Sequence, residues 1–263
     1  MIPYLNGHVG TFNLPIVGTV PIELFGILVA IGVILGDRVV STQAPRFGLD
    51  PRDVKYLNVW IVLVGFIVAH LVSVIFYFPE RIVENPLVLL NVWSGLSSFG
   101  GFLGATLAFF YLTKKHKIPR LAYADVLALG LSIGWIFGRA GCFSAHDHPG
   151  RHTSFFLAVR YPDGPRHDLG FYEMLFTIGL SALLFAFARK RRPDGHVVGL
   201  AALLYGVARF GFDFLRATDV ARPDRRYLAL TPAQWACLAT VALGIHLLRK
   251  RAPVSAPPAA PAT

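Results

Sequence analysis

The feature that most constrains the fold is a series of apolar stretches, each close to twenty residues long and separated by short polar segments. A helix needs about 20 apolar residues to cross a hydrocarbon core of about 30 Å. Inside lipid, the backbone groups must also be paired within the segment, which favours helices. The sequence therefore predicts an all-α, polytopic membrane protein with about seven transmembrane helices. These spans are expected at 20–36, 56–78, 95–113, 121–138, 170–188, 197–215 and 231–248.

Composition supports this fold class. Hydrophobic residues make up 54% of the chain and charged residues 15%, and the mean hydropathy is +0.55. The net charge of +10 could suit nucleic acid, but the basic residues lie in short clusters between apolar runs, as in membrane proteins. We therefore expect a lipid bilayer and no nucleic acid as a partner. One membrane domain is expected over 1–251, followed by a disordered Pro/Ala-rich tail at 252–263.

The basic residues also predict an orientation. Fifteen Lys and Arg fall in the segments 37–56, 114–120, 189–196 and 249–251, whereas eight fall on the opposite side. The side richer in Lys and Arg is usually cytoplasmic. This places the N-terminus in the periplasm and the C-terminus in the cytoplasm. No secretory leader is expected, because the first twenty residues contain no Lys or Arg.

The densest group of chemically active side chains is at 138–151, which reads GRAGCFSAHDHPGR. Arg139 follows directly after a predicted span, where a charge is costly without a counter-ion and indicates a functional site. The simpler interpretation is an arginine that extends to the lipid headgroups. The glycines of the preceding span, Gly130, Gly134 and Gly138, are spaced for close helix packing, as are Gly100 and Gly104.

A second polar group lies in the sixth predicted span. Tyr205, Arg209, Asp213 and Arg216 share one helical face, and Arg209 can pair with Asp213 at i, i+4. One interpretation is that Arg209 and Asp213 form a purely structural ion pair. The other is that the arginines bind phosphate through their paired donors. His70, deep in the second span, is expected to be a buried neutral imidazole with one hydrogen bond.

Taken together, these segments resemble the bacterial prolipoprotein diacylglyceryl transferases. The likeness is carried by four segments in order and spacing: NPLVLLNVWSGLSSFGG, GRAGCFSAHDHPGR, RHDLGFYE and GLAALLYGVARFGFDFLRATD. The matching positions are Gly138, Arg139, Gly141, Phe143, Asp147, Gly150, Arg151, Tyr172, Glu173, Arg209, Asp213 and Arg216. The resemblance implies a multi-pass protein of the bacterial inner (plasma) membrane. It would move the diacylglyceryl group of phosphatidylglycerol to the lipobox cysteine in the signal peptide of a preprolipoprotein.

The chain departs from that family's pattern at several polar positions. Cys142 and Ala145 replace two signature asparagines, and Phe99 replaces a histidine before the paired glycines of the third span. Phe25 replaces a tyrosine, and His70 an arginine. The sequence thus indicates a divergent member whose lipid site is better preserved than its chemistry.

The resemblance also suggests a mechanism. A thiolate attacks the glyceryl C3, and glycerol phosphate leaves, so the site needs cations for the phosphate and a base for the thiol. Arg139, with Arg209 and Arg216, is expected to bind the phosphate, and Asp147 and Asp213 to orient the arginines. His146 or His148 would be the base. Cys142, Gly150, Tyr172 and Glu173 are expected to support the site.

Several alternatives remain open at this point. Cys142, His146 and His148 could ligate zinc, but a fourth ligand is missing, so we expect neither a metal nor a cofactor. Cys142 could instead be a covalent nucleophile. A divergent paralogue could bind phospholipid without this catalysis, or transfer a lipid group to another acceptor. A small-molecule transporter is disfavoured because no inverted repeat is evident.

Overall fold

The computed structural model describes residues 1–14, 18–90, 95–220 and 224–250 of the chain. The predicted tail at 252–263 therefore lies outside the described residues, as does Arg222. The chain forms two compact units. The first comprises Met1–Val39 with residues 124–250, and the second contains Val40–Tyr123. The chain passes between the units within two long helices, α1 and α5.

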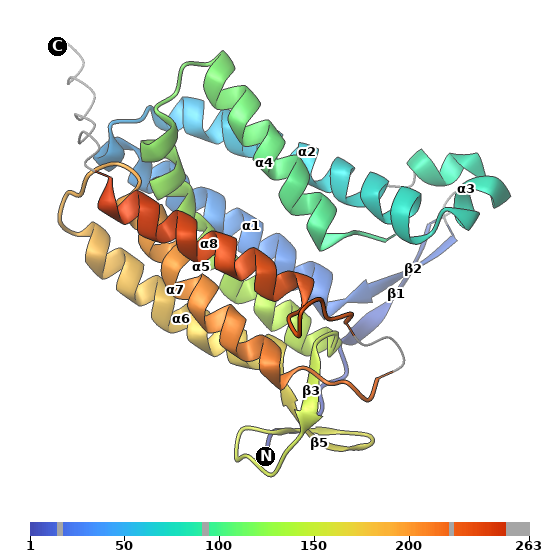
Figure 1. Cartoon of the computed structure of the whole chain (residues 1–263). Coiled ribbons are helices and arrows are strands. Elements are labelled where there is room, and N and C mark those ends of the chain that lie inside the picture. The colour runs from blue at the N-terminus through green and yellow to red at the C-terminus, as the bar shows by residue number, and fades with distance from the viewer. Residues whose placement is uncertain (15–17, 91–94, 221–223, 251–263) are drawn as a thin grey trace. The chain divides into compact units, whose positions relative to one another are not determined.

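The first unit contains most of the predicted spans (Figure 1). Its helices are α1 (Leu24–Gln43), α5 (Arg120–Ala145), α6 (Leu169–Ala188), α7 (His196–Phe212), the short 3₁₀-helix η4 (Asp213–Leu215) and α8 (Pro232–Arg249). Helix α7 packs along both α6 and α8. This arrangement brings the polar face of α7 beside the first turns of α6.

The second unit consists of α2 (Pro51–Val72) packed against α4 (Ser98–Lys115), with short helical turns between them. The short elements are η1 (Ala44–Phe47), the π-helical turn η2 (Ser73–Tyr77), α3 (Glu80–Glu84) and η3 (Pro86–Leu90). A Cβ at Gly104 would lie 2.6 Å from the Val68 Cβ, so the predicted close packing is confirmed here. His70 is fully buried and its Nε2 lies 3.0 Å from the Val88 carbonyl, as predicted.

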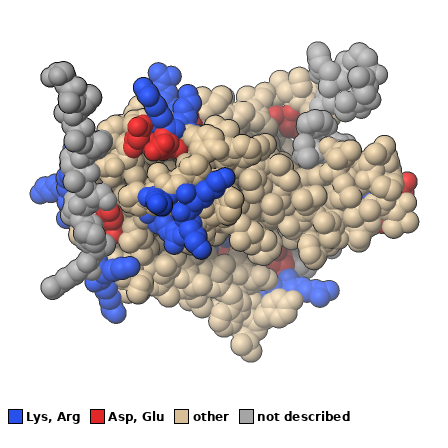
Figure 2. Space-filling view, turned by 90° about the horizontal axis from the view of Figure 1, so that it is seen from above, with Lys and Arg blue, Asp and Glu red and all other residues tan. Residues whose placement is uncertain are grey.

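Among the described residues, five helical segments are long and apolar enough to cross a membrane: Leu24–Phe47, Pro51–Tyr77, Arg120–Ala145, Leu169–Ala188 and His196–Leu215. The remaining two predicted spans are helical, as α4 and α8, but are not among the five. On the face that Figure 2 shows, charged side chains form a few separate groups, and most atoms belong to uncharged residues. The protein is therefore a multi-pass membrane protein.

The prediction of an all-α fold needs a correction, because the described chain contains two small antiparallel sheets. Strands β1 (His8–Leu14) and β2 (Gly18–Glu23) form a hairpin. The strands β3 (Pro149–His152), β4 (Val159–Tyr161) and β5 (Gly164–Asp168) form a sheet in the order β3-β5-β4. Four of the five strands lie outside the predicted spans, where period-3.6 patterning carries no information, and β2 overlaps the start of the first predicted span.

Glycines set the position of α5 within the first unit. A Cβ on Gly32 of α1 would lie 2.7 Å from the Gly134 carbonyl oxygen, and one on Gly134 would lie 3.0 Å from the Gly32 oxygen. Only glycine allows two helix backbones to approach this closely. The prediction for Gly138 was wrong, since no atom lies within 4 Å of its would-be Cβ. The contact at Gly134 thus holds the helix that carries Arg139.

Candidate functional site

Helix α5 extends further than the sequence predicted, and this changes the position of Arg139. The span was expected to end at Gly138, but the helix continues to Ala145. Arg139 therefore lies inside the helix, with its residue only 9% exposed. This burial argues against an arginine that extends to the headgroups.

Arg139 belongs to a chain of alternating charges that we call the arginine–carboxylate network: Arg139, Glu173, Arg209, Asp213 and Arg216. Glu173, which is fully buried on α6, lies between two guanidinium groups. Its Oε2 is 3.0 Å from Arg139 Nε, and its Oε1 is 3.2 Å from Arg209 Nε. One carboxylate therefore joins helices α5 and α7 through α6.

The second carboxylate of the network, Asp213, repeats this arrangement at the end of α7. Its Oδ1 accepts a hydrogen bond of 2.9 Å from Arg209 Nη1 and lies 3.1 Å from Arg216 Nε. Its Oδ2 accepts a hydrogen bond from the Thr231 hydroxyl. The predicted i, i+4 pair of Arg209 and Asp213 is confirmed. Arg216, whose side chain is 23% exposed, also pairs with Asp224.

Aromatic groups surround the guanidinium of Arg139. Its Nη2 donates to the Tyr205 hydroxyl at 3.2 Å, and that hydroxyl donates to Glu173 at 2.9 Å. The Trp135 indole also donates to Tyr205, at 3.0 Å, and its ring lies 4.7 Å from the Arg139 guanidinium carbon. These contacts fix the plane of the guanidinium group, while Nη1 lies 3.7 Å from the Cys142 sulfur.

The two candidate bases, His146 and His148, lie in different surroundings. His146 is buried, with Nδ1 3.0 Å from Asp168 Oδ2 and Nε2 3.0 Å from the Leu5 carbonyl oxygen and 3.3 Å from the Leu5 amide nitrogen. Its ring stacks on Tyr4, with 3.8 Å between the centroids. Protein groups thus occupy both ring nitrogens and one ring face, so the geometry of His146 is that of a structural group.

Asp168 holds this part of the site together. Its Oδ1 caps α6 by accepting from the Phe171 amide at 2.9 Å, and its Oδ2 accepts from the Tyr161 hydroxyl at 2.8 Å. Burial raises the pKa of the Tyr161 hydroxyl, which keeps it a donor. Asp168 thus caps α6, and Glu173, one turn further along, is left to pair with the arginines of the network.

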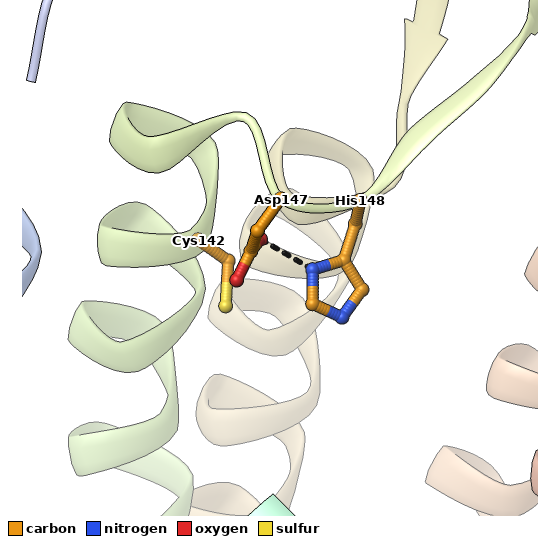
Figure 3. A group of neighbouring side chains, drawn as sticks. All are labelled: Cys142, Asp147 and His148. Carbon is orange, nitrogen blue, oxygen red and sulfur yellow. Dashed lines mark hydrogen bonds and ion pairs between the residues drawn. The ribbon is translucent and has the colours of Figure 1, made fainter. Parts of the chain in front are cut away.

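His148 instead forms a compact group with Cys142 and Asp147 (Figure 3). One ligand-type atom from each residue lies within 4.8 Å of the other two. The carboxylate accepts a hydrogen bond from His148 Nδ1, and the Asp147 side chain is 42% exposed. We call this group the thiol–imidazole cluster. Asp147 was expected to orient Arg139, but the carboxylate that pairs with Arg139 is Glu173.

The supporting residues Gly150 and Tyr172 connect the sheet to the helices. A Cβ on Gly150 would lie 2.8 Å from the carbonyl oxygens of His167 and Leu215, so the strand and the end of η4 require a glycine here. The Tyr172 hydroxyl is 2.8 Å from His167 Nδ1. Gly150 also forms an isolated antiparallel bridge with Arg216 of the network, so both residues position neighbouring elements.

A second set of charges, which we call the outer cluster, lies on the β3–β5 sheet. Arg166 donates to Asp219 at 2.9 and 2.7 Å and to Asp163 at 2.6 Å, while Nε2 of His152 lies 3.5 Å from Asp219. The hydrogen bonds from Arg166 lower the pKa of the Asp219 carboxyl to about 2, and that of Asp163 below its usual value. The Arg166 side chain is buried, whereas both carboxylates are exposed.

Several residues of the site were missed from sequence. Trp135, Asp168 and Thr231 make specific contacts with the predicted groups. A usable signal existed for Thr231, because Thr-Pro-Ala-Gln is a capping box before an apolar run. Asp168 carries a similar signal as an N-cap residue directly before an apolar run, whereas no local pattern marks Trp135.

Together, the fold and the site define a multi-pass membrane protein whose helices enclose an arginine-rich polar network. The sequence matches the prolipoprotein diacylglyceryl transferase family over residues 12–249. The chain belongs to this family.

Named relatives agree over most of the chain. The phosphatidylglycerol–prolipoprotein diacylglyceryl transferase of Nitratidesulfovibrio vulgaris (strain DP4) is 35% identical, covering 86% of each chain. The protein of the same name in Polynucleobacter asymbioticus is 34% identical, covering 79% of this chain and 82% of that one. The one in Pseudomonas aeruginosa (strain UCBPP-PA14) is 32% identical, covering 88% and 90%.

Proposed function

We propose that this protein transfers the diacylglyceryl group of phosphatidylglycerol to the cysteine thiol of a prolipoprotein. The relatives carry the name of this activity, and they match the chain over most of its length. The observation that carries the proposal furthest is the arginine–carboxylate network. Its three guanidinium groups meet two buried carboxylates, and the most exposed of the three, Arg216, also pairs with the exposed Asp224.

A phosphodiester carries a single negative charge, which closely spaced guanidinium groups can bind through paired donors. Arg139 and Arg209 are held by Glu173 in fixed orientations, so they need little reorganisation when a phosphate arrives. Pre-organised donors of this kind stabilise developing charge on a leaving group. We assign the phosphate to Arg139 and Arg209, with Arg216 at the more exposed end. Glu173 and Asp213 orient these arginines.

The acceptor thiol reacts as a thiolate, so the site must remove its proton. The groups suited to this lie in the thiol–imidazole cluster, and the contact between Arg139 Nη1 and Cys142 links that cluster to the network. Asp147 and His148 can act as a carboxylate–imidazole base or as ligands of a metal. His146 holds Leu5 and Asp168 and is assigned a positioning role.

A non-catalytic phospholipid-binding paralogue is the second candidate. It is favoured by Phe99, which occupies the place of a family histidine and offers no proton acceptor. The same replacement is also compatible with a transferase that uses another acceptor. Both candidates keep the phosphate site and differ only in the thiol chemistry.

The test is transfer by the purified full chain from labelled phosphatidylglycerol to a lipobox peptide. A peptide carrying a thioether-linked diacylglyceryl group, formed with phosphatidylglycerol and absent with a cysteine-to-serine peptide, is the expected result. Phospholipid binding without product would favour the paralogue. Rescue of a bacterium depleted of its own transferase provides the matching test in cells.

We further propose seven spans in the inner membrane, with the N-terminus in the periplasm and the C-terminus in the cytoplasm. The unequal distribution of Lys and Arg supports this orientation. It places the thiol–imidazole cluster on the exterior side, where exported lipoproteins emerge. A reporter fused after Arg251 is expected to read cytoplasmic, and a periplasmic signal would overturn the orientation.

A further inference from the structure

The thiol–imidazole cluster combines three kinds of donor atom in one place. Cys142 is on the last turn of α5, and Asp147 and His148 follow the end of that helix (Figure 3). A sulfur, an oxygen and a nitrogen lie within 4.8 Å of one another. A hydrogen bond between Asp147 and His148 explains why those two side chains meet, but it does not account for the sulfur beside them.

This set of atoms has the composition of a catalytic zinc site. Zinc binds thiolate at about 2.3 Å and imidazole or carboxylate at about 2.0–2.2 Å, and its catalytic sites have three protein ligands with a fourth position open. Tetrahedral geometry at those lengths requires ligand atoms roughly 3.3–3.8 Å apart. The sulfur therefore needs to approach the other two atoms by about 1 Å, and the hydrogen-bonded atoms of Asp147 and His148 need to separate slightly. Asp147 and His148 lie beyond the helix end, where the backbone is not held by helical hydrogen bonds.

We propose that Cys142, Asp147 and His148 bind one Zn²⁺ ion whose open position receives the thiol of the acceptor cysteine. This proposal rests on the transferase function proposed above and deepens it by naming how the thiol is activated. Phosphate and metal then occupy neighbouring places, because Arg139 contacts both Glu173 and the Cys142 sulfur.

The charges of the cluster suit a divalent cation beside an arginine. The Cys142 thiolate and the Asp147 carboxylate contribute two negative charges, which cancel those of the ion. The bound metal would therefore add no net repulsion toward Arg139, which lies 3.7 Å from the sulfur. The exposed side of Asp147 leaves an approach for the acceptor peptide.

The chemical step balances with the ion as a Lewis acid. The acceptor thiol coordinates the ion and releases its proton to water, since a coordinating thiol is deprotonated. A lone pair on that sulfur forms the new S–C bond at the glyceryl C3, and the C3–O bond to phosphate breaks. The electron pair of that bond stays on the phosphate oxygen, which is the leaving group that the arginines stabilise. The ion does not change its oxidation state.

The first test measures metal binding without reference to activity. The full chain, purified in detergent and freed of metal, is titrated with Co²⁺, which gives thiolate-to-metal absorption when bound by cysteine. The expected result is one equivalent bound, with this absorption lost in Cys142→Ser and weakened in His148→Ala. Cys237→Ser, which removes the chain's only other thiol, and His116→Ala are matched controls that should retain it.

The second test connects the ion to transfer. Removing metal with a chelator should slow transfer at pH 7 by about tenfold, because only a few per cent of a free thiol is ionised there, and added Zn²⁺ should restore the rate. Transfer that is unchanged after chelation would overturn the zinc proposal and leave the transferase function standing, with His148 as a metal-free base. Metal binding with no transfer under any condition would overturn the transferase function alone.

Failure to bind Co²⁺ in a chain that still binds phosphatidylglycerol would also overturn the zinc proposal. Asp147→Asn serves as a second ligand variant if Cys142→Ser does not fold. It keeps the shape of the side chain and removes its charge, so it should reduce the affinity for Co²⁺ and leave phosphatidylglycerol binding intact. Equal Co²⁺ affinity in Asp147→Asn and in the parent chain would remove Asp147 from the site.

Discussion

The arginine–carboxylate network and the outer cluster use the same side chains in different surroundings. In both, an arginine with little exposed surface meets two carboxylates. The carboxylates Glu173 and Asp213 of the network are fully buried, whereas Asp163 and Asp219 of the outer cluster are about half exposed. The same pairing thus has to hold without water in one case and in its presence in the other.

This difference in burial indicates which of the two charge clusters can respond to a ligand. An exposed pair is screened and contributes little, whereas a buried charge that loses its partner is strongly unfavourable. The network can therefore keep its arginines aligned only while every charge is matched. A single phosphate is enough to alter that balance, which makes the network responsive to a ligand in a way that the outer cluster is not.

The largest expected effect comes from breaking the network at Asp213. Asp213→Ala removes a partner of both Arg209 and Arg216 and should cost about 3–5 kcal/mol of stability. The double change of Arg209→Leu with Asp213→Leu should cost less, because Glu173 keeps Arg139 and Arg216 keeps Asp224. Membrane yield measures both. Equal yields for the two variants would mean that Arg209 and Asp213 are not coupled. Asp219→Ala, which removes an exposed carboxylate of the outer cluster, is the comparison variant.

The second-largest expected effect is a loss of transfer activity when Arg139 is replaced. Arg139→Ala should reduce transfer by about 10²–10³-fold, the loss typical of a pre-organised donor, while the chain still inserts. Arg139→Lys keeps the charge but loses the paired donors, and it should fall between the parent and the alanine variant. Binding of phosphatidylglycerol to the purified proteins measures this. Unchanged affinity in Arg139→Ala would remove the phosphate role, and Arg166→Lys in the outer cluster should leave it unaffected.

A smaller effect should follow from a methyl group at Gly150. Its Cβ would meet His167 and Leu215 at 2.7–2.8 Å, and overpacking of this kind costs about 1–3 kcal/mol. Thermal unfolding of purified Gly150→Ala should therefore show a lower Tm. Gly138→Ala is the matched control, because that position is open and helical, so its Tm should equal or exceed the parent's. An unchanged Tm in Gly150→Ala would disprove the tight contact.

The smallest effect is the response of the outer cluster to acid. Arg166 lowers the pKa of the Asp219 carboxyl from its usual 3.8 to about 2, so the stabilisation is present above about pH 4 and is lost as the pH falls toward 2. Hydrogen exchange of β3–β5 should accelerate across that range. Asp219→Asn should flatten the response. His152, which faces both carboxylates, is unchanged in that variant.

The sequence predicted best those features that depend on helical periodicity. The apolar runs predicted the helices, and the four-residue spacing of Tyr205, Arg209 and Asp213 predicted a shared face and an ion pair that the structure confirms. The strands were not predicted, because each is short and its pairing depends on a partner elsewhere. Strand β3, for example, pairs with β5, with Pro149 opposite Asp168, His152 opposite Arg166 and a shift of register between them.

The site was harder to predict because its decisive contacts are long-range. Glu173 is at the start of α6, where a carboxylate commonly interacts with the helix dipole, and nothing local shows that arginines from α5 and α7 converge on it. His146 and His148 are two residues apart and look equivalent in sequence. The structure separates them, since one ring holds Leu5 and Asp168 and the other meets Asp147.

The contacts of the first residues have a consequence for the order of assembly. The Ile2 amide donates to the Ala158 carbonyl at 2.8 Å, the Arg160 amide donates to Ile2 at 3.0 Å, and Tyr4 and Leu5 hold His146. Residues 2–5 thus find these partners only after some 150 later residues have been synthesised. Until then His146 lacks its contacts with Tyr4 and Leu5. We therefore expect a newly inserted chain to become active only after residues 2–5 have formed their contacts with β4 and His146. Insertion would then precede activity.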